Sequence, residues 1–84
     1  MEVVLMTRNE MAVKDLGEAA VLTMAGMPLV EFRTTDDIFW FVFGEKDKCQ
    51  LISNSYWFGE YLVDAKTFME TIVRLKNRIF SVKN

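Results

Sequence analysis

Histidine is absent from this chain of 84 residues, and cysteine occurs once, as Cys49. Without histidine the chain lacks the usual general base at neutral pH and the commonest metal ligand. One thiol cannot form an internal disulfide, and it cannot hold a zinc ion alone. We therefore expect Cys49 to be a structural residue in a buried or half-buried place, and we expect neither enzyme activity nor a cofactor.

Long hydrophobic runs, low-complexity tracts and a basic leader are also missing. No apolar run approaches the roughly 20 residues that a membrane-spanning helix needs. Met1-Glu2 does not open in the manner of a signal peptide. Six methionines without a disulfide are typical of a reducing compartment. These absences predict a cytoplasmic protein that does not associate with a membrane.

Apolar side chains are plentiful, at 51% hydrophobic and 13% aromatic residues. That composition predicts a hydrophobic core and a single domain over residues 1–84. The most informative run is 38–43, because a strand would place Ile38, Trp40 and Val42 on one face and three phenylalanines on the other. Since both faces are apolar, the strand is either central in a tight core or waiting for a partner chain on one face.

Periodicity predicts the other elements around this strand. Leu16, Ala20 and Met24 share a helix face, and Phe68 begins a stripe that continues through Ile72, Leu75 and Ile79. We expect helices over 13–25, 47–58 and 65–81, the last two capped by Asp47 and Asp64. We expect a hairpin of strands 29–34 and 38–43, with Val30 and Phe32 on one face.

The predicted fold is α+β, in the order (β)αββαα. A small antiparallel sheet of two or three strands packs against two to three helices. Residues 2–6 provide the optional strand, residues 7–12 are expected to be irregular, and residues 82–84 to be frayed. The helix over 13–25 is apolar nearly all round in its second half, so it should be buried on more than one side and is a second hint of a self-interface.

Charge is uneven along the chain, although the net value is only −2. Residues 1–63 carry five basic and ten acidic side chains, whereas residues 64–84 carry five basic and two acidic ones. Two copies can pair head to tail on this basis, or the cations can simply favour a helix C-terminus. Arg74, Lys76 and Arg78 form a candidate basic patch, which indicates a small RNA- or single-strand-binding module as the alternative function.

Aromatic residues crowd the segment 55–61. Together with Trp40 they give a candidate protein interface, made of Trp40, Tyr56, Trp57 and Tyr61. Alternatively, Trp57 and Phe58 close the core while the tyrosine hydroxyls reach water. A third hypothesis, a metal-dependent hydrolase or nuclease, rests on Asp36 and Asp37, although adjacent aspartates in a turn commonly bond their own backbone.

Three segments together resemble a small uncharacterised family of bacterial and phage proteins. They are the helix start Asp-Leu-Gly-Glu-Ala-Ala-Val-Leu at 15–22, the hairpin end Phe-Val-Phe at 41–43, and the tail 62–68 with Leu-Lys-Asn-Arg-Ile-Phe at 75–80. The resemblance covers residues 13–81. It implies a compact α+β domain encoded on a mobile element, and it implies no activity.

These observations favour a non-catalytic protein-interaction domain. We expect a homodimer or a domain that binds a host protein, with inhibition of a host defence component as one role that fits. This prediction of an interaction domain is based on the two-sided strand, the apolar helix and the aromatic cluster.

Overall fold

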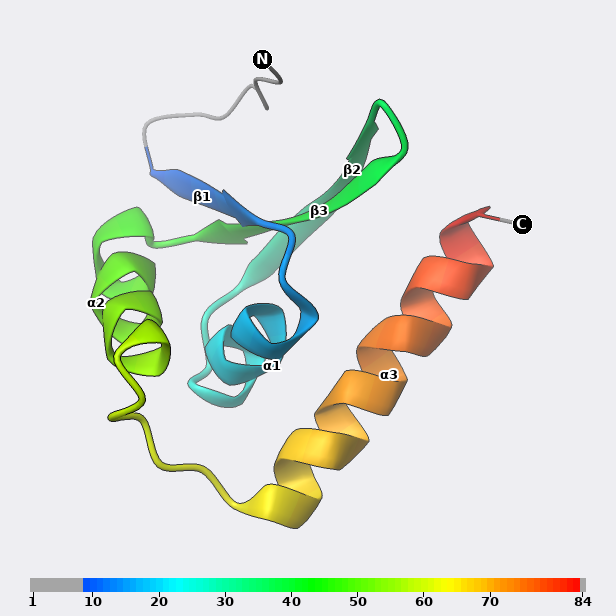
Figure 1. Cartoon of the computed structure of the whole chain (residues 1–84). Helices are drawn as coiled ribbons and strands as arrows, with labels where there is room; N and C mark the ends of the chain where they lie inside the picture. Colours follow the sequence, from blue (N-terminus) through cyan, green and yellow to red (C-terminus); the bar gives the residue numbers. More distant parts are fainter. Residues whose placement is uncertain (1–8, 84) are drawn as a thin grey trace.

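The computed structural model of the chain describes residues 9–83 (Figure 1). Its elements are β1 (Glu10–Val13), α1 (Leu16–Met24), β2 (Leu29–Thr35), β3 (Ile38–Gly44), α2 (Lys46–Trp57) and α3 (Ala65–Lys83). The fold is α+β in the order β α β β α α, as the sequence predicts. The strand predicted over residues 2–6 lies outside the described residues.

The sheet is antiparallel with the strand order β1-β3-β2, so β3 is its central strand. Three successive residues of β3, Phe41, Val42 and Phe43, are at most 1% exposed. A strand can bury successive side chains only when both of its faces are covered. The structure thus places this segment at the centre of the sheet, as one of the two interpretations of the sequence expects.

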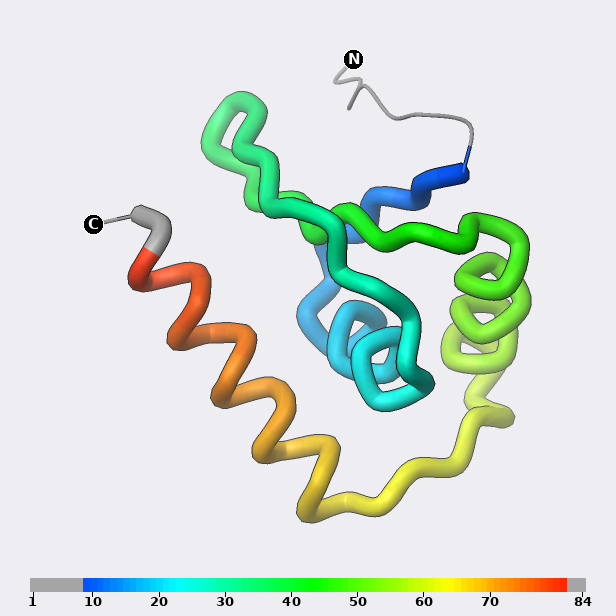
Figure 2. Tube along the Cα trace, turned by 180° about the vertical axis from the view of Figure 1, so that it is seen from behind, coloured from blue at the N-terminus to red at the C-terminus, as the bar shows by residue number. Residues whose placement is uncertain are grey.

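The row Phe39, Phe41 and Phe43 is the one that faces the helices. Phe41 and Phe43 share a hydrophobic cluster with residues of all three helices, against which Phe39 also packs. The helices lie on the same side of the sheet, with α1 between α2 and α3 (Figure 1, and from behind Figure 2). This cluster is the core of the molecule, and every helix and strand contributes to it or packs against it. Its buried members are Val13, Ala19, Ala20, Leu22, Phe41, Phe43, Cys49 and Leu75, and Leu29 and Phe32 pack beside them.

No helix of the described residues covers the opposite row, because all three lie on the other side of the sheet (Figure 1 and Figure 2). Val42 is fully buried, and Ile38 and Trp40 are half-buried. Arg33 lies on this same face and forms an ion pair with Glu31 at 2.7 Å. Apart from Val30 on β2, the large exposed hydrophobic side chains are found elsewhere, on α2, α3 and the connections.

The prediction that residues 7–12 are irregular is wrong for Glu10 to Ala12, which belong to β1. The helix predicted to begin at Val13 begins at Leu16. Met11 pairs with Phe43, and Val13 pairs with Phe41, so β1 adds a third strand to the hairpin. The helix begins at Leu16 because Asp15 caps it, accepting a hydrogen bond from the Glu18 N–H at 2.8 Å. Pairing with β3 gives this short segment backbone partners that its own composition does not predict.

The face assignment of β2 is also wrong at one residue. The pairing register shifts between Leu29 and Glu31, so Val30 is an extra residue in the strand. Leu29 thereby takes the core position opposite Phe43, and Val30 is 51% exposed. Phe32 keeps its predicted place on the core face.

Helix α1 is buried on several sides, as its composition predicts. Ala19, Ala20, Val21 and Leu22 are consecutive and at most 2% exposed. The covering surfaces come from within the chain, because α1 packs against both α2 and α3. Its apolar character is therefore used in the monomer, and it does not supply the self-interface that the sequence suggested.

Helix α2 begins at Lys46, and Glu45 rather than Asp47 is its N-terminal cap residue. Glu45 has a left-handed backbone (φ 59°) and makes no capping hydrogen bond with its side chain. The backbone N–H of Lys46 instead donates to the Asn9 side-chain oxygen at 3.3 Å. The chain leaves α2 through Gly59, whose φ of +75° suits glycine at a helix end.

Asp64 caps α3 as predicted. Its carboxylate accepts hydrogen bonds from the Thr67 backbone N–H at 2.8 Å and from the Thr67 hydroxyl at 2.7 Å. The helix then continues to Lys83, beyond the predicted end at residue 81. The hydrogen bonds to Thr67 hold the pKa of the Asp64 carboxyl below its ordinary value.

Asp64→Ala is expected to lower the stability of the protein at neutral pH, because it removes both hydrogen bonds. A carboxyl whose folded-state pKa is lowered stabilises the fold only while it is ionised. The difference between wild type and variant should therefore shrink as pH falls through the folded-state pKa of Asp64. Thermal unfolding of both proteins over a pH series measures this, and a difference that stays constant into acid would contradict it.

Candidate binding site

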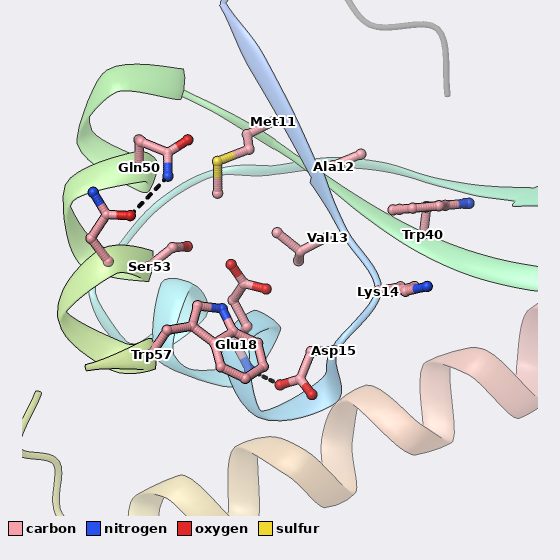
Figure 3. A pocket seen from close by; sticks show the side chains of 11 residues that line it. Met11, Ala12, Val13, Lys14, Asp15, Glu18, Trp40, Gln50, Ser53 and Trp57 are labelled. Atoms are coloured by element: carbon pink, nitrogen blue, oxygen red, sulfur yellow. Dashed lines mark hydrogen bonds between the residues drawn. The ribbon is translucent and has the colours of Figure 1, made fainter. Parts of the chain in front are cut away.

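An open pocket of about 690 Å³ lies between β1 and α2 (Figure 3). We call it the β1–α2 pocket. On one side it is lined by Met11 to Asp15, from β1 and the start of α1. On the other side it is lined by one face of α2, and Glu18 and Trp40 complete it; the α2 residues are Gln50, Ser53, Asn54 and Trp57.

Two of the predicted interface residues, Trp40 and Trp57, line this pocket at opposite ends (Figure 3). Trp40 is held from both sides: its indole N–H donates to the Thr35 hydroxyl at 2.8 Å, and the Lys14 ammonium lies 5.8 Å from its ring centroid. Trp57 is 60% exposed, and its ring meets Tyr56 edge to face at 5.0 Å. The pocket thus has one fixed and one exposed indole.

Tyr56, the third predicted interface residue, does not line the pocket but contacts two residues that do, Trp57 and Asp15. Its hydroxyl donates to the Asp15 carboxylate at 3.1 Å, the same oxygen that caps α1. Burial raises the pKa of the Tyr56 phenol, and the nearby Asp15 and Glu18 carboxylates raise it further. A Cβ atom at Gly17 would collide with the Tyr56 hydroxyl, which explains a glycine inside α1.

Tyr61, the fourth predicted interface residue, is half-buried in the connection between α2 and α3 and does not line the pocket. The alternative in which Trp57 and Phe58 close the core is wrong. Phe58 is 79% exposed, because α2 presents the other side of its last turns to α1 and the sheet.

Polar groups in the β1–α2 pocket are incompletely paired. Ser53 is only 3% exposed, and its hydroxyl makes no hydrogen bond with the described residues. The Gln50 side-chain amide donates to the Asn54 side-chain oxygen at 3.0 Å, which leaves the Gln50 oxygen as an acceptor. Figure 3 shows the Glu18 side chain pointing into the same space.

A second surface lies on α3, away from the core stripe. Met69, Val73 and Phe80 are 57%, 52% and 64% exposed on one side of the helix; we call them the α3 outer face. A shallow groove of about 430 Å³ runs beside Met69 and Val73, between Glu70, Arg74 and Asn77. Sequence reasoning missed this face, although the spacings of four and seven residues were present in the sequence.

The three residues of the predicted basic patch, Arg74, Lys76 and Arg78, do not share one face of α3. Residues two apart on a helix point in directions about 160° apart, so Lys76 faces away from Arg74 and Arg78. The Arg78 guanidinium lies 5.2 Å from the Phe32 ring centroid and covers the hairpin. Arg74 lines the groove beside the α3 outer face.

The other candidate residues, Asp36, Asp37 and Cys49, lie where a structural role explains them. Asp36 and Asp37 form the two-residue hairpin turn with φ of 45° and 68°, and within residues 9–83 no group of three potential metal-ligating side chains occurs. Cys49 is fully buried, and its thiol donates to the Gly44 carbonyl at 3.2 Å. Burial raises the pKa of this thiol, and the Glu45 carboxylate adds to that effect. A raised pKa disfavours the thiolate, which fits the structural interpretation of Cys49.

Comparisons with protein-family models, with curated proteins and with solved structures gave no match to this chain. The resemblance to the uncharacterised bacterial and phage family therefore stays a prediction. Among residues 9–83, no helix has both the length and the apolar character that crossing a bilayer requires.

Proposed function

We propose that this protein is a non-catalytic interaction domain that pairs with a second copy of itself through the α3 outer face. The observation that carries the proposal is the exposure of Met69, Val73 and Phe80. They lie on a helix whose other side already packs on the core through Leu75. Lys76 lies on the same side between Val73 and Phe80, so the face combines three exposed apolar side chains with one cation, and an interaction surface is one use of such a face.

A second copy fits this surface because its flanking charges are self-complementary. Glu70 and Arg74 line the groove beside the apolar side chains. In a dimer with twofold symmetry each surface meets itself, so an acidic group on one copy can face a basic group on the other. With 19 residues α3 is about 28 Å long, which leaves ample length for an antiparallel helix pair.

The resemblance supports a narrower version of the proposal. It implies a phage or mobile-element protein, and the α3 outer face would then bind a host protein, for example a component of host defence. That role also needs no catalytic residue, because the domain would act by sequestering its target.

The alternative function, binding of RNA or single-stranded nucleic acid, gains no support from the geometry. Lys76 points away from Arg74 and Arg78, and the Trp40 ring is occupied by Lys14. A stacking platform beside a basic groove needs both features on one surface.

Val73→Glu is expected to convert a concentration-dependent dimer into a monomer. The substitution places a charge in the middle of the α3 outer face, where two copies would bury it. Leu51→Glu is the matched control: it places the same charge at another exposed apolar position, on α2, and should leave the dimer intact. Sedimentation velocity measures both variants, and the same substitution should abolish capture of a host protein from a bacterial lysate.

Equal dimerisation of wild type and Val73→Glu would contradict the assignment of the surface. A wild-type protein that stays monomeric over the whole concentration series would contradict self-association itself.

A further inference from the structure

The β1–α2 pocket contains a buried hydroxyl that has no partner among the described residues. Ser53 is 3% exposed, and Figure 3 shows its side chain pointing into the pocket. Buried polar side chains in folded proteins nearly always have a hydrogen-bond partner. The hydroxyl oxygen is itself covered from solvent, so a ligand in the pocket can supply the missing bond once the neighbouring side chains move aside.

Two carboxylates, those of Asp15 and Glu18, are among the polar groups that line this pocket, against one cation, Lys14. The Glu18 carboxylate points into it and makes no hydrogen bond with its side chain among the described residues, while the Gln50 side chain retains a free oxygen after donating to Asn54. The nearest cation, Lys14, lies over the Trp40 ring. A ligand that donates several hydrogen bonds and carries positive charge complements such a site, whereas an anion would be repelled by Glu18 and Asp15.

The rest of the lining suits an aliphatic stem ending in a cation. Met11 and Val13 present apolar side chains on the β1 side. Trp57 presents an exposed indole on the α2 side, and indole faces attract ammonium groups. An alkyl chain can thus pack along β1 while its terminal charge lies between Trp57 and Glu18.

We infer that the β1–α2 pocket binds an alkylammonium group, with Glu18 as its counter-ion, the Ser53 hydroxyl as acceptor and Trp57 as its aromatic wall. The group is carried either by a free amine or by a lysine side chain of another polypeptide. This inference does not depend on the α3 outer face, which lies on a different helix.

The test compares charged and neutral probes of equal size. Butylamine and butanol are titrated into the wild-type protein while the two indole N–H resonances, from Trp40 and Trp57, are followed by NMR. Butylamine should shift the Trp57 resonance in a saturable manner and butanol should not. Equal effects of the two probes would overturn the inference, and so would stronger binding of butyrate, which is titrated as the anionic probe of the same size.

Two variants assign the residues. Glu18→Gln should weaken butylamine binding by about tenfold through loss of the counter-ion. Glu60→Gln, which removes an exposed carboxylate outside the pocket, should leave binding unchanged. Unchanged affinity in Glu18→Gln would contradict the proposed site.

Ser53→Ala separates binding from structure. The variant should unfold at a higher temperature than wild type, because it removes an unsatisfied buried hydroxyl, yet it should bind butylamine several-fold more weakly. A purely structural serine would change stability without changing affinity. Ser53→Ala with wild-type affinity would remove the hydroxyl from the site.

The source of the ammonium group is decided by two further probes, cadaverine and N-acetyl-lysine methylamide. Tighter binding of the lysine derivative, abolished by acetylation of its side-chain amine, identifies a polypeptide ligand. Tighter binding of cadaverine identifies a free diamine. Binding of neither probe would contradict the inference.

Discussion

Phe41→Ala is expected to lower the free energy of unfolding by about 3–5 kcal/mol. Phe41 is 1% exposed, lies opposite Val13 in the sheet and contacts the rings of Phe32 and Phe39 at 5.6 and 5.4 Å between centroids. Truncation would leave a cavity between the sheet and the helices. Since small domains are stable by only about 5–15 kcal/mol, the variant should be largely destabilised. Denaturant unfolding measures the loss.

Trp40→Ala, one residue earlier on the opposite face, is the control for this prediction. Trp40 is half-buried and contacts Lys14 and Thr35 rather than the helices. Its truncation should cost clearly less than that of Phe41, although tryptophan is the larger side chain. If Phe41→Ala does not fold, Phe41→Leu gives the same comparison. A larger loss for Trp40→Ala would mean that the phenylalanine row does not face the helices.

Gly17→Ala should destabilise the protein, although alanine is the better helix former. The added methyl group would displace the Tyr56 hydroxyl from Asp15, which also caps α1. Loss of a hydrogen bond to a carboxylate outweighs the gain in helix propensity, for a net loss of about 1–2 kcal/mol. The free energy of unfolding from denaturant titration measures it.

Tyr56→Phe provides the control for Gly17→Ala. With the hydroxyl gone the closest contact disappears, while Asp15 Oδ2 at 3.2 Å and the ring Cζ at 3.3 Å remain, so the same substitution should cost clearly less. The two effects should therefore be non-additive in a double-mutant cycle. Additive effects would show that the contact between Gly17 and Tyr56 does not limit this position.

Local patterns were sufficient to predict most of the fold. The alternation in 38–43 identified the central strand, and the turn chemistry at Asp36 and Asp37 identified the hairpin. The stripe that includes Leu75 identified the core side of α3. In each of these segments, the residues that determine the element lie close together in the sequence.

The segments that were predicted wrongly depend on distant partners. β1 is a strand because Met11 and Val13 meet β3, some thirty residues later in the chain. One local signal for the boundary was present, the spacing of Asp15 and Glu18, which is typical of a helix start. It would have placed the start of the helix after Asp15 and left residues 10–13 outside it. Val30 leaves the core because Leu29 takes its place, and a bulge of this kind is decided by the pairing register.

The candidate site was predicted only in part for the same reason. Trp40 and Trp57 were predicted as interface residues from their chemistry, and the structure places both at the β1–α2 pocket. Residue type alone did not reveal that Tyr56 is tied to Asp15, or that Ser53 is buried without a partner. Those properties arise where α2 packs beside β1 and α1.

The α3 outer face is the central element of this account, and intermolecular NOEs test it most directly. In a sample in which half of the chains carry isotope label, filtered NMR spectra report only contacts between copies. The account predicts NOEs from the Val73 methyl groups of one copy to Met69 or Phe80 of the other. A dimer whose intermolecular NOEs arise only from other surfaces, or a sample that shows none, would contradict it.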